Sequence, residues 1–234
     1  MKKQLICLAM GLISLLTANG QWKNPVPENP LAQSIGLLVG TTGIGLEYYR
    51  PLGNQLGVQA GFSLMPFTTH IMGQYGQYDT RNRVETQMHN AHILLAWEPF
   101  HYTGGVLRHF TINAGAAYFF RLMGTVRTTL DEPYYYGDIL VSSELLGSAR
   151  TRVSWGSRVM PHFGFALTNV RIDERFGFNV GIGGYYLPSP EVRMTGTNLL
   201  SDNEHNGPII ERNLRDYRLL PQLQLGVNYK LQID

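Results

Sequence analysis

The chain has 234 residues, of which 44% are hydrophobic, 15% charged and 11% aromatic, with 19 basic against 17 acidic residues. This near balance excludes a strongly basic, nucleic-acid-binding protein. The mean hydropathy of −0.12 argues against a membrane protein made of apolar helices, although a membrane β-barrel hides its apolar surface in alternate residues.

The first 20 residues have the pattern of a secretory signal peptide. Lys2 and Lys3 precede an apolar run at residues 5–17, and small residues follow, which predicts cleavage after Gly20. A transmembrane anchor is the alternative, but this run is too short to span a bilayer. Cleavage leaves 17 basic and 17 acidic residues and removes Cys7, the single cysteine, which excludes a disulfide framework.

Residues 21–34 form a proline-rich leader that cannot be a central strand, and residues 35–234 are predicted to form one barrel domain. Seven segments of this domain alternate apolar and polar residues with the period of a β-strand. These segments are residues 35–50, 55–67, 84–100, 110–126, 152–167, 176–195 and 219–231. Because about 9–11 tilted residues cross the hydrocarbon layer, we expect the apolar faces to contact lipid and the polar faces to line a lumen.

Short and long connections alternate along the chain, and the long loops are predicted at residues 68–83, 131–147 and 196–216, with a short helical turn at 210–216. Bacterial barrels have even strand numbers, short periplasmic turns and long outer loops, so an eighth strand is required. Three candidates for it stay open. They are the leader, a split of the first strand near Thr41-Thr-Gly43, and part of residues 136–146.

Several short segments carry a resemblance to known proteins. They are Val39-Gly-Thr-Thr-Gly-Ile-Gly-Leu-Glu47 with Pro51-Leu52, Leu94-Leu-Ala-Trp-Glu-Pro-Phe100 running into residues 110–115, Pro161-His-Phe-Gly-Phe165, Ser189-Pro-Glu-Val192, and residues 221–231. Together they resemble a family of small, largely uncharacterised outer-membrane β-barrel proteins of Gram-negative bacteria. The chain departs from that family at Ala96, where an acidic residue is usual, and at its end, where Gln232-Ile-Asp234 replaces an aromatic final residue. The resemblance implies a barrel of the outer-membrane protein A or W type and supplies no activity.

The polar strand faces predict a charged lumen. A barrel of eight strands is just wide enough to be filled by side chains, and buried charges need partners. We therefore expect Glu47 or Glu98 to pair with Arg121 or Arg158, with His162 in the same network. A plugged lumen with a structural, membrane-integrity role is the main hypothesis. A narrow passive pore for small solutes, in which these pairs exchange partners, is the alternative.

A lipid-acting enzyme of the outer membrane is a third hypothesis, since Ser154 or Ser157 near His162 offers a nucleophile and a base. Ser157 and His162 have opposite strand parity, so no motif brings them together, and we expect no catalytic residues. His89 and His92 are three apart and point to opposite faces of a strand, so we expect no metal site and no cofactor.

The competing fold is a secreted, lipocalin-like soluble barrel, which places apolar residues inside and polar residues outside. Long, aromatic-bounded apolar faces opposite glycines and charges favour the membrane barrel instead. We therefore expect a monomer in the cell outer membrane. Its expected partners are outer-membrane lipids, lipopolysaccharide and the outer-membrane assembly machinery, with no nucleic acid.

Overall fold

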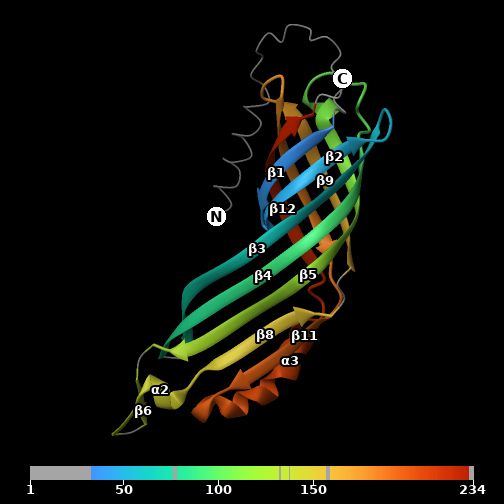
Figure 1. Cartoon of the computed structure of the whole chain (residues 1–234). Coiled ribbons are helices and arrows are strands. Elements are labelled where there is room, and N and C mark those ends of the chain that lie inside the picture. Colours follow the sequence, from blue (N-terminus) through green and yellow to red (C-terminus); the bar gives the residue numbers. More distant parts are fainter. Residues whose placement is uncertain (1–32, 76–77, 132, 137, 157–158, 232–234) are drawn as a thin grey trace. The chain divides into compact units, whose positions relative to one another are not determined.

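The computed structural model describes residues 33–75, 78–131, 133–136, 138–156 and 159–231. In these residues the chain is all-β and antiparallel, with a ten-stranded sheet and a separate two-stranded sheet (Figure 1). The predicted signal peptide and most of the leader lie outside the described residues. None of the described helices is long and apolar enough to cross a membrane.

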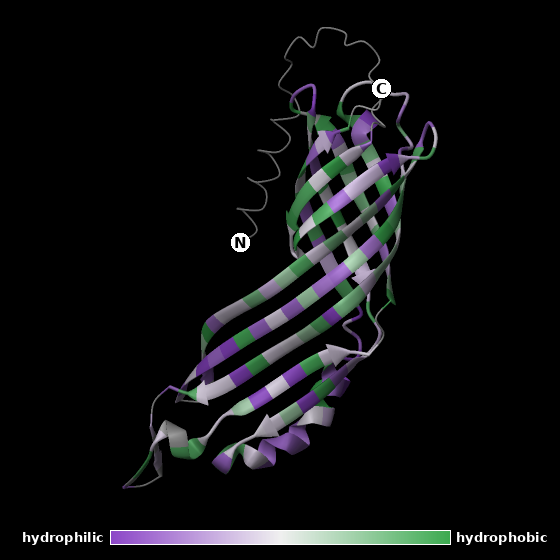
Figure 2. Cartoon of the chain, in the orientation of Figure 1, coloured by the Kyte–Doolittle hydropathy of each residue, from purple (hydrophilic) through white to green (hydrophobic). Residues whose placement is uncertain are grey.

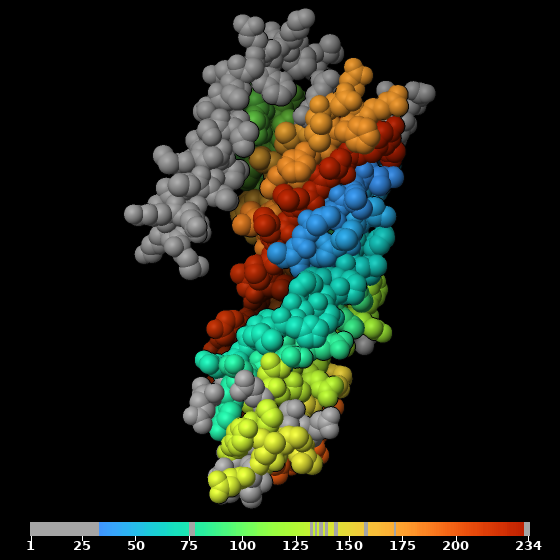
Figure 3. All heavy atoms as spheres, turned by 90° about the vertical axis from the view of Figure 1, so that its left-hand side faces the viewer, coloured from blue at the N-terminus to red at the C-terminus, as the bar shows by residue number. Residues whose placement is uncertain are grey.

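Eight strands close into a barrel, which confirms the predicted transmembrane fold. In ring order they are β1 (Ser34–Gly40), β2 (Gly43–Pro51), β3 (Leu56–Tyr75), β4 (Tyr78–Trp97), β5 (Phe110–Leu130), β9 (Val159–Arg171), β10 (Phe176–Tyr186) and β12 (Leu219–Lys230). The ring closes because β12 pairs with β1, and Figure 3 shows these two strands side by side. The backbone N–H of Leu231 donates to the carbonyl oxygen of Gln33 over 2.7 Å at this junction.

The eighth strand arises from the split of residues 35–50, one of the three candidates. The chain reverses at Thr41 and Thr42 and enters β2 at Gly43, whose φ of 105° is a conformation that glycine adopts readily. The backbone N–H of Thr41 donates to the carbonyl oxygen of Leu223 over 3.0 Å, which ties this turn to β12. The candidate segment 136–146 instead forms parts of a small hairpin, β6 (Tyr134–Tyr136) and β7 (Ile139–Val141), and α2 (Ser143–Leu146).

Three strands run on beyond the ring and carry what we call the sheet extension. The predicted loop at 68–83 is wrong, because β3 and β4 stay paired from Thr68 opposite Glu85 to Tyr75 opposite Tyr78. The last residues of β5 pair with β8 (Ala149–Trp155), and β8 pairs with β11 (Pro190–Gly196).

Two predicted strands therefore each divide between the extension and the barrel. The segment 152–167 breaks after β8 at Gly156, and 176–195 breaks between β10 and β11 at Pro188, where a proline cannot donate a ladder hydrogen bond. In the extension β8 pairs with β5 and β11, whereas in the ring β9 pairs with β5 and β10 and β10 pairs with β9 and β12. Because the alternation does not encode these partners, it could not show the break.

Short helices accompany the sheet. The connection between β4 and β5 contains η1 (Val106–His109), and the predicted long loop at 196–216 contains η2 (Asn198–Asn206) and α3 (Gly207–Leu214). The predicted helical turn at 210–216 overlaps α3. This helix packs against β11, where Oε2 of Glu211 accepts a hydrogen bond from the backbone N–H of Val192 over 3.1 Å. A polar helix side chain thus covers part of an edge strand that otherwise has unpaired backbone groups.

Hydrophobic and hydrophilic residues alternate along the strands of the ring (Figure 2), and the hydrophobic ones are exposed on its outer surface. Its exposed side chains include Ile35, Leu37, Val39, Ile44, Leu46, Phe62, Leu64, Ile93, Leu95, Phe163, Phe165, Ile182, Leu223, Leu225 and Val227. Monomeric soluble proteins rarely expose apolar patches of this extent, and transmembrane barrels always do. The lipocalin-like alternative, with its polar exterior, is excluded.

Candidate functional site

The barrel lumen is the candidate site. Most of the polar side chains that the alternation predicts to face inward do lie in this lumen. Three inward positions mark successive levels of the lumen: Glu98, which follows β4 at the end of the ring where the described chain begins and ends, then His92, and then Met88 at the end that leads to the extension. With a strand rise of about 3.3 Å per residue, they define three successive layers.

The layer near the termini is polar and hydrogen-bonded. Oε1 of Glu98 accepts a hydrogen bond from the hydroxyl of Tyr49 over 3.3 Å, and Oε2 lies 3.3 Å from Nδ1 of His101. Burial raises the pKa of Glu98, which follows the last residue of β4. Nearby, Nδ2 of Asn179 donates to Asn228 over 2.9 Å, and Nδ2 of Asn228 donates to Oδ1 of Asn169 over 3.0 Å.

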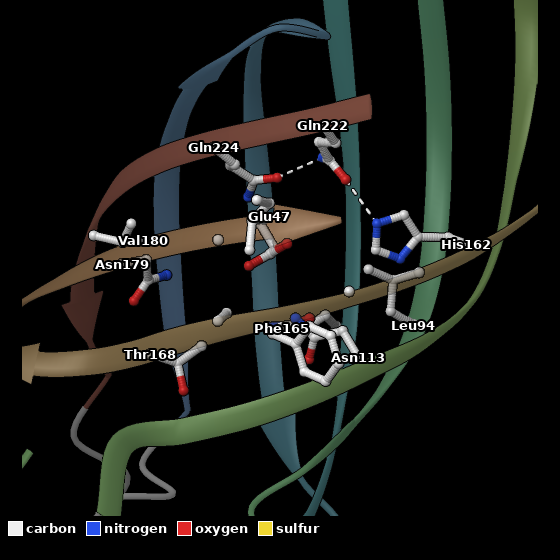
Figure 4. A pocket seen from close by; sticks show the side chains of 15 residues that line it. Glu47, Leu94, Asn113, His162, Phe165, Thr168, Asn179, Val180, Gln222 and Gln224 are labelled. Atoms are coloured by element: carbon white, nitrogen blue, oxygen red, sulfur yellow. Dashed lines mark hydrogen bonds between the residues drawn. The ribbon is translucent and has the colours of Figure 1, made fainter. Parts of the chain in front are cut away.

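The middle layer holds Glu47, His92 and His162, of which Figure 4 shows Glu47 and His162. Nε2 of His92 lies 3.4 Å from Oε2 of Glu47, and both side chains are almost completely buried. Nε2 of His162 lies 2.7 Å from Oε1 of Gln222, whose Nε2 donates to Oε1 of Gln224 over 2.7 Å. The layer is therefore crossed by polar contacts between strands that are far apart in the sequence.

A cavity of about 30 Å³ lies between the side chains of this layer. Three of its lining residues, Gln59, Asn113 and His162, each have a buried polar atom without a hydrogen-bond partner among the described residues. This volume admits one or two water molecules, and those three atoms supply the partners that buried waters need. It does not admit a continuous column of water.

Apolar side chains close the end of the lumen that leads to the extension. We call the cluster of Met88, Ala117, Phe119, Leu122, Met160, Tyr185 and Leu187 the apolar cap. The rings of Phe119 and Tyr185 meet edge to face with centroids 5.2 Å apart, and Tyr185 also lies 4.7 Å from the ring of His162. No local pattern in the sequence marks this cap, because its members come from β4, β5, β9 and β10 and from Leu187 just after β10, and the alternation does not encode how these strands pair.

The structure brings together only part of the predicted charge network. Glu47, Glu98 and His162 face the lumen, but Glu47 contacts His92 rather than an arginine. Arg121 lies on the outer face, contrary to expectation, and its Nη1 donates to Oε1 of Gln87 over 3.2 Å. Arg158 lies outside the described residues.

A β-bulge explains the position of Arg121. His89 pairs with Arg121 and the next residue, Asn90, pairs with Phe119, so Phe120 is an extra residue in β5. A bulge shifts the alternation by one residue. Beyond it Leu122 faces inward and Arg121 faces outward, the reverse of the uninterrupted pattern.

The serine and histidine considered for catalysis are not brought together. Ser154 lies in β8 opposite Met123 in the extension, whereas His162 faces the lumen, and Ser157 lies outside the described residues. His89 and His92 lie on opposite faces of β4. In the described part of the chain, no group of three or more His, Cys, Asp or Glu side chains could hold a metal ion.

His109 predicts a pH dependence of stability. It ends η1, outside the strands, with Nδ1 3.0 Å from the carbonyl oxygen of Thr168, and burial lowers its pKa. The ordinary pKa of a histidine is about 6.5, and below this pH His109 binds a proton more readily in the unfolded chain than in the folded chain. The free energy of unfolding therefore falls as the pH falls. Urea unfolding at several pH values is expected to show this loss, and His109→Asn is expected to reduce it.

His205 supplies the control for this measurement, because it is exposed in η2. His205→Asn is expected to keep the wild-type pH dependence. An equal pH dependence in wild type and His109→Asn would contradict the role of His109.

Comparison with known proteins supports the fold. No protein-family model and no curated protein sequence matches the chain. The crystal structure of CarO2 from Acinetobacter baumannii resembles it with a TM-score of 0.64 and 16% sequence identity, over 86% of this chain and 99% of that chain. CarO from the same organism gives a TM-score of 0.63 and 16% identity, over 86% of this chain and 97% of that chain. Both are outer-membrane β-barrels, and at this identity the likeness shows the fold alone.

Proposed function

We propose that this protein is a closed outer-membrane β-barrel with a structural role, which anchors the sheet extension at the cell surface and conducts no solutes. The filling of the lumen carries the proposal. Polar layers joined by hydrogen bonds occupy most of the interior, the apolar cap closes one end, and the cavity between them is about 30 Å³. A hydrated ion needs a continuous wet path, which this packing does not provide.

Two bands of aromatic side chains support the membrane location. Near the termini the outward positions include Tyr48, Trp97, Phe110, Phe176 and Tyr229, and at the other end of the ring they include Tyr118, Phe120 and Tyr186. Aromatic girdles of this kind mark both interfaces of a transmembrane barrel. The signal-peptide pattern of residues 1–20 agrees with export across the inner membrane.

The connections support an orientation with the extension outside the cell. The turns at residues 52–55 and 172–175 are short and lie at the end of the ring that holds both ends of the described chain. The connections at the opposite end carry β8, β11 and α3. Short turns face the periplasm and long connections face outward in outer-membrane barrels.

Planar-bilayer recording tests the closed lumen. Pure wild-type protein is expected to give no single-channel steps, while unboiled gel migration shows that the inserted protein is folded. Regular steps from the same preparation would contradict the proposal and establish the narrow pore instead. Hydrolysis of phospholipid by the pure protein, lost in His162→Ala, would contradict the structural role in favour of an enzyme.

Cell fractionation tests the location independently. The protein is expected in the outer-membrane fraction, with faster gel migration before boiling than after it. Recovery in the soluble periplasmic fraction would refute the membrane anchor, whatever the conductance.

A further inference from the structure

Five arginines lie together on one face of the sheet extension. We call Arg83, Arg127, Arg150, Arg152 and Arg193 the arginine patch; all five are exposed, and they come from β4, β5, β8 and β11. Arg127 has the strand parity of Arg121, so the patch continues the lipid-facing side of the barrel. Figure 2 shows hydrophilic residues along this part of β4, β5 and β8.

The strand registers place these arginines directly opposite one another. Arg127 is the cross-strand partner of Arg83 on one side and of Arg150 on the other. Arg152 is the partner of Arg193. Directly opposite residues have Cβ atoms about 5 Å apart, and like charges at this distance destabilise a sheet.

Acidic groups on the same face compensate only part of this repulsion. Glu85 forms an ion pair with Arg83 over 2.7 Å, and Asp79, Asp131 and Glu191 lie at the margins of the same face. The other four arginines of the patch have no ion pair with any described residue. The positive charges of the patch repel one another and so destabilise the folded sheet. An anion bound between the arginines would remove this repulsion.

A hollow at the margin of the patch adds a shaped site. Arg127 lines it together with Arg81 and Thr129 of the same face, and its volume is about 600 Å³. Asp131 also lines it and holds Arg81 through an ion pair of 2.6 Å. Sites for small ligands have volumes of about 300–1,000 Å³, so this one admits a phosphorylated sugar.

The position of the patch indicates the source of the anion. The aromatic pair Tyr118 and Phe120 marks the outer edge of the apolar belt, and Arg127 follows Phe120 by seven residues. A strand covers about 23 Å in this distance, or roughly 17 Å along the membrane normal at the usual tilt. In the outer leaflet this level is occupied by the acidic, phosphorylated core sugars of lipopolysaccharide.

We propose that the arginine patch binds the phosphorylated core oligosaccharide of lipopolysaccharide. Each guanidinium can hold a phosphate group through two parallel N–H···O hydrogen bonds, and facing arginines can share one phosphate. The site so formed fixes the extension against the sugar layer beside it. This placement rests on the proposed outward orientation, whereas the binding itself can be measured in solution.

The test uses folded protein in nanodiscs without lipopolysaccharide and, as probe, a deacylated core oligosaccharide that keeps its phosphates. Wild type is expected to bind by calorimetry, more weakly as salt is added. The triple variant Arg127→Gln, Arg150→Gln, Arg152→Gln is expected to bind at least tenfold more weakly. The matched triple variant Arg175→Gln, Arg212→Gln, Arg215→Gln, with the same loss of charge at other exposed positions, is expected to stay within twofold of wild type.

Three results would overturn the proposal. They are equal weakening in both triple variants, undiminished binding of the dephosphorylated oligosaccharide, and tighter binding of a sulfated polysaccharide than of the core oligosaccharide. Unboiled gel migration verifies that each variant folds, and removing the facing charges is expected to raise the temperature at which the patch variant unfolds at low salt. The orientation is tested separately, by introducing a cysteine at Thr195 and labelling it on intact cells. Absence of labelling would contradict the outward orientation, whereas the calorimetry tests the binding alone.

Discussion

Replacing Gly115 with alanine is expected to lower the free energy of unfolding by about 3 kcal/mol. A Cβ atom at this position in β5 would meet the backbone of β4, with the carbonyl oxygen of Ile93 as its nearest atom and Cα of Leu94 at 2.8 Å. Backbone atoms of a paired strand cannot move aside as a flexible side chain can. Urea titration of the protein refolded in lipid vesicles, followed by unboiled gel migration, measures the loss.

Gly181 provides a matched control for this substitution. It is also an inward glycine of a barrel strand, but its added Cβ would lie 3.6 Å from Cβ of Ala166, which is an ordinary contact. Gly181→Ala is expected to keep or slightly raise stability, because alanine restricts the unfolded chain. Equal stability of the two variants would refute the close approach of β5 and β4 at Gly115.

Removing the ring of Phe119 is expected to cost about 3–5 kcal/mol, the usual range for a buried phenylalanine replaced by alanine. Phe119 is 1% exposed in the apolar cap, where its ring packs edge to face on Tyr185. Phe119→Ala therefore leaves a cavity under the extension. The same urea titration is expected to show a midpoint well below that of wild type.

The neighbouring Phe120 tests whether the loss comes from the cap. Its side chain is 51% exposed on the lipid face, so Phe120→Ala removes transfer free energy of about 1–2 kcal/mol and creates no internal cavity. If Phe120→Ala were as destabilising as Phe119→Ala, the apolar cap would not be the origin of the effect.

The sequence predicts the barrel well where a strand faces lipid on one side and the lumen on the other along its whole length. β12 is such a strand: Leu223, Leu225 and Val227 are exposed, and Gln222 and Asn228 are buried, as the alternation indicates. The same alternation predicts Glu47, Glu98 and His162 as inward residues, and all three are buried. The prediction is sharp because a shift of one residue would turn every side chain of a strand to the other face.

The features that the sequence did not predict depend on which strands pair and in which register, and the alternation of polar and apolar residues does not encode this. The side to which Arg121 points changes with one bulge at Phe120, and nothing local in residues 118–122 marks it. The division of residues 152–167 follows from β8 and β9 pairing with different halves of β5. The arginine patch joins β4 to β11, separated by about a hundred residues, so only the registers reveal it.

The two-residue turn between β1 and β2 has a consequence for how the protein meets its neighbours. Because the chain reverses at Thr41 and Thr42, neither β1 nor β2 extends beyond the ring. The sheet beyond the ring consists instead of the ends of β3, β4 and β5, with β8 and β11 paired beside β5. The barrel is therefore asymmetric around its axis. The side formed by β3, β4 and β5 continues into the sheet extension, and the opposite side ends at the lipid surface. Two copies would approach each other most closely along the low flank formed by β12, β1 and β2, so crowding in the membrane would orient the molecules as well as pack them.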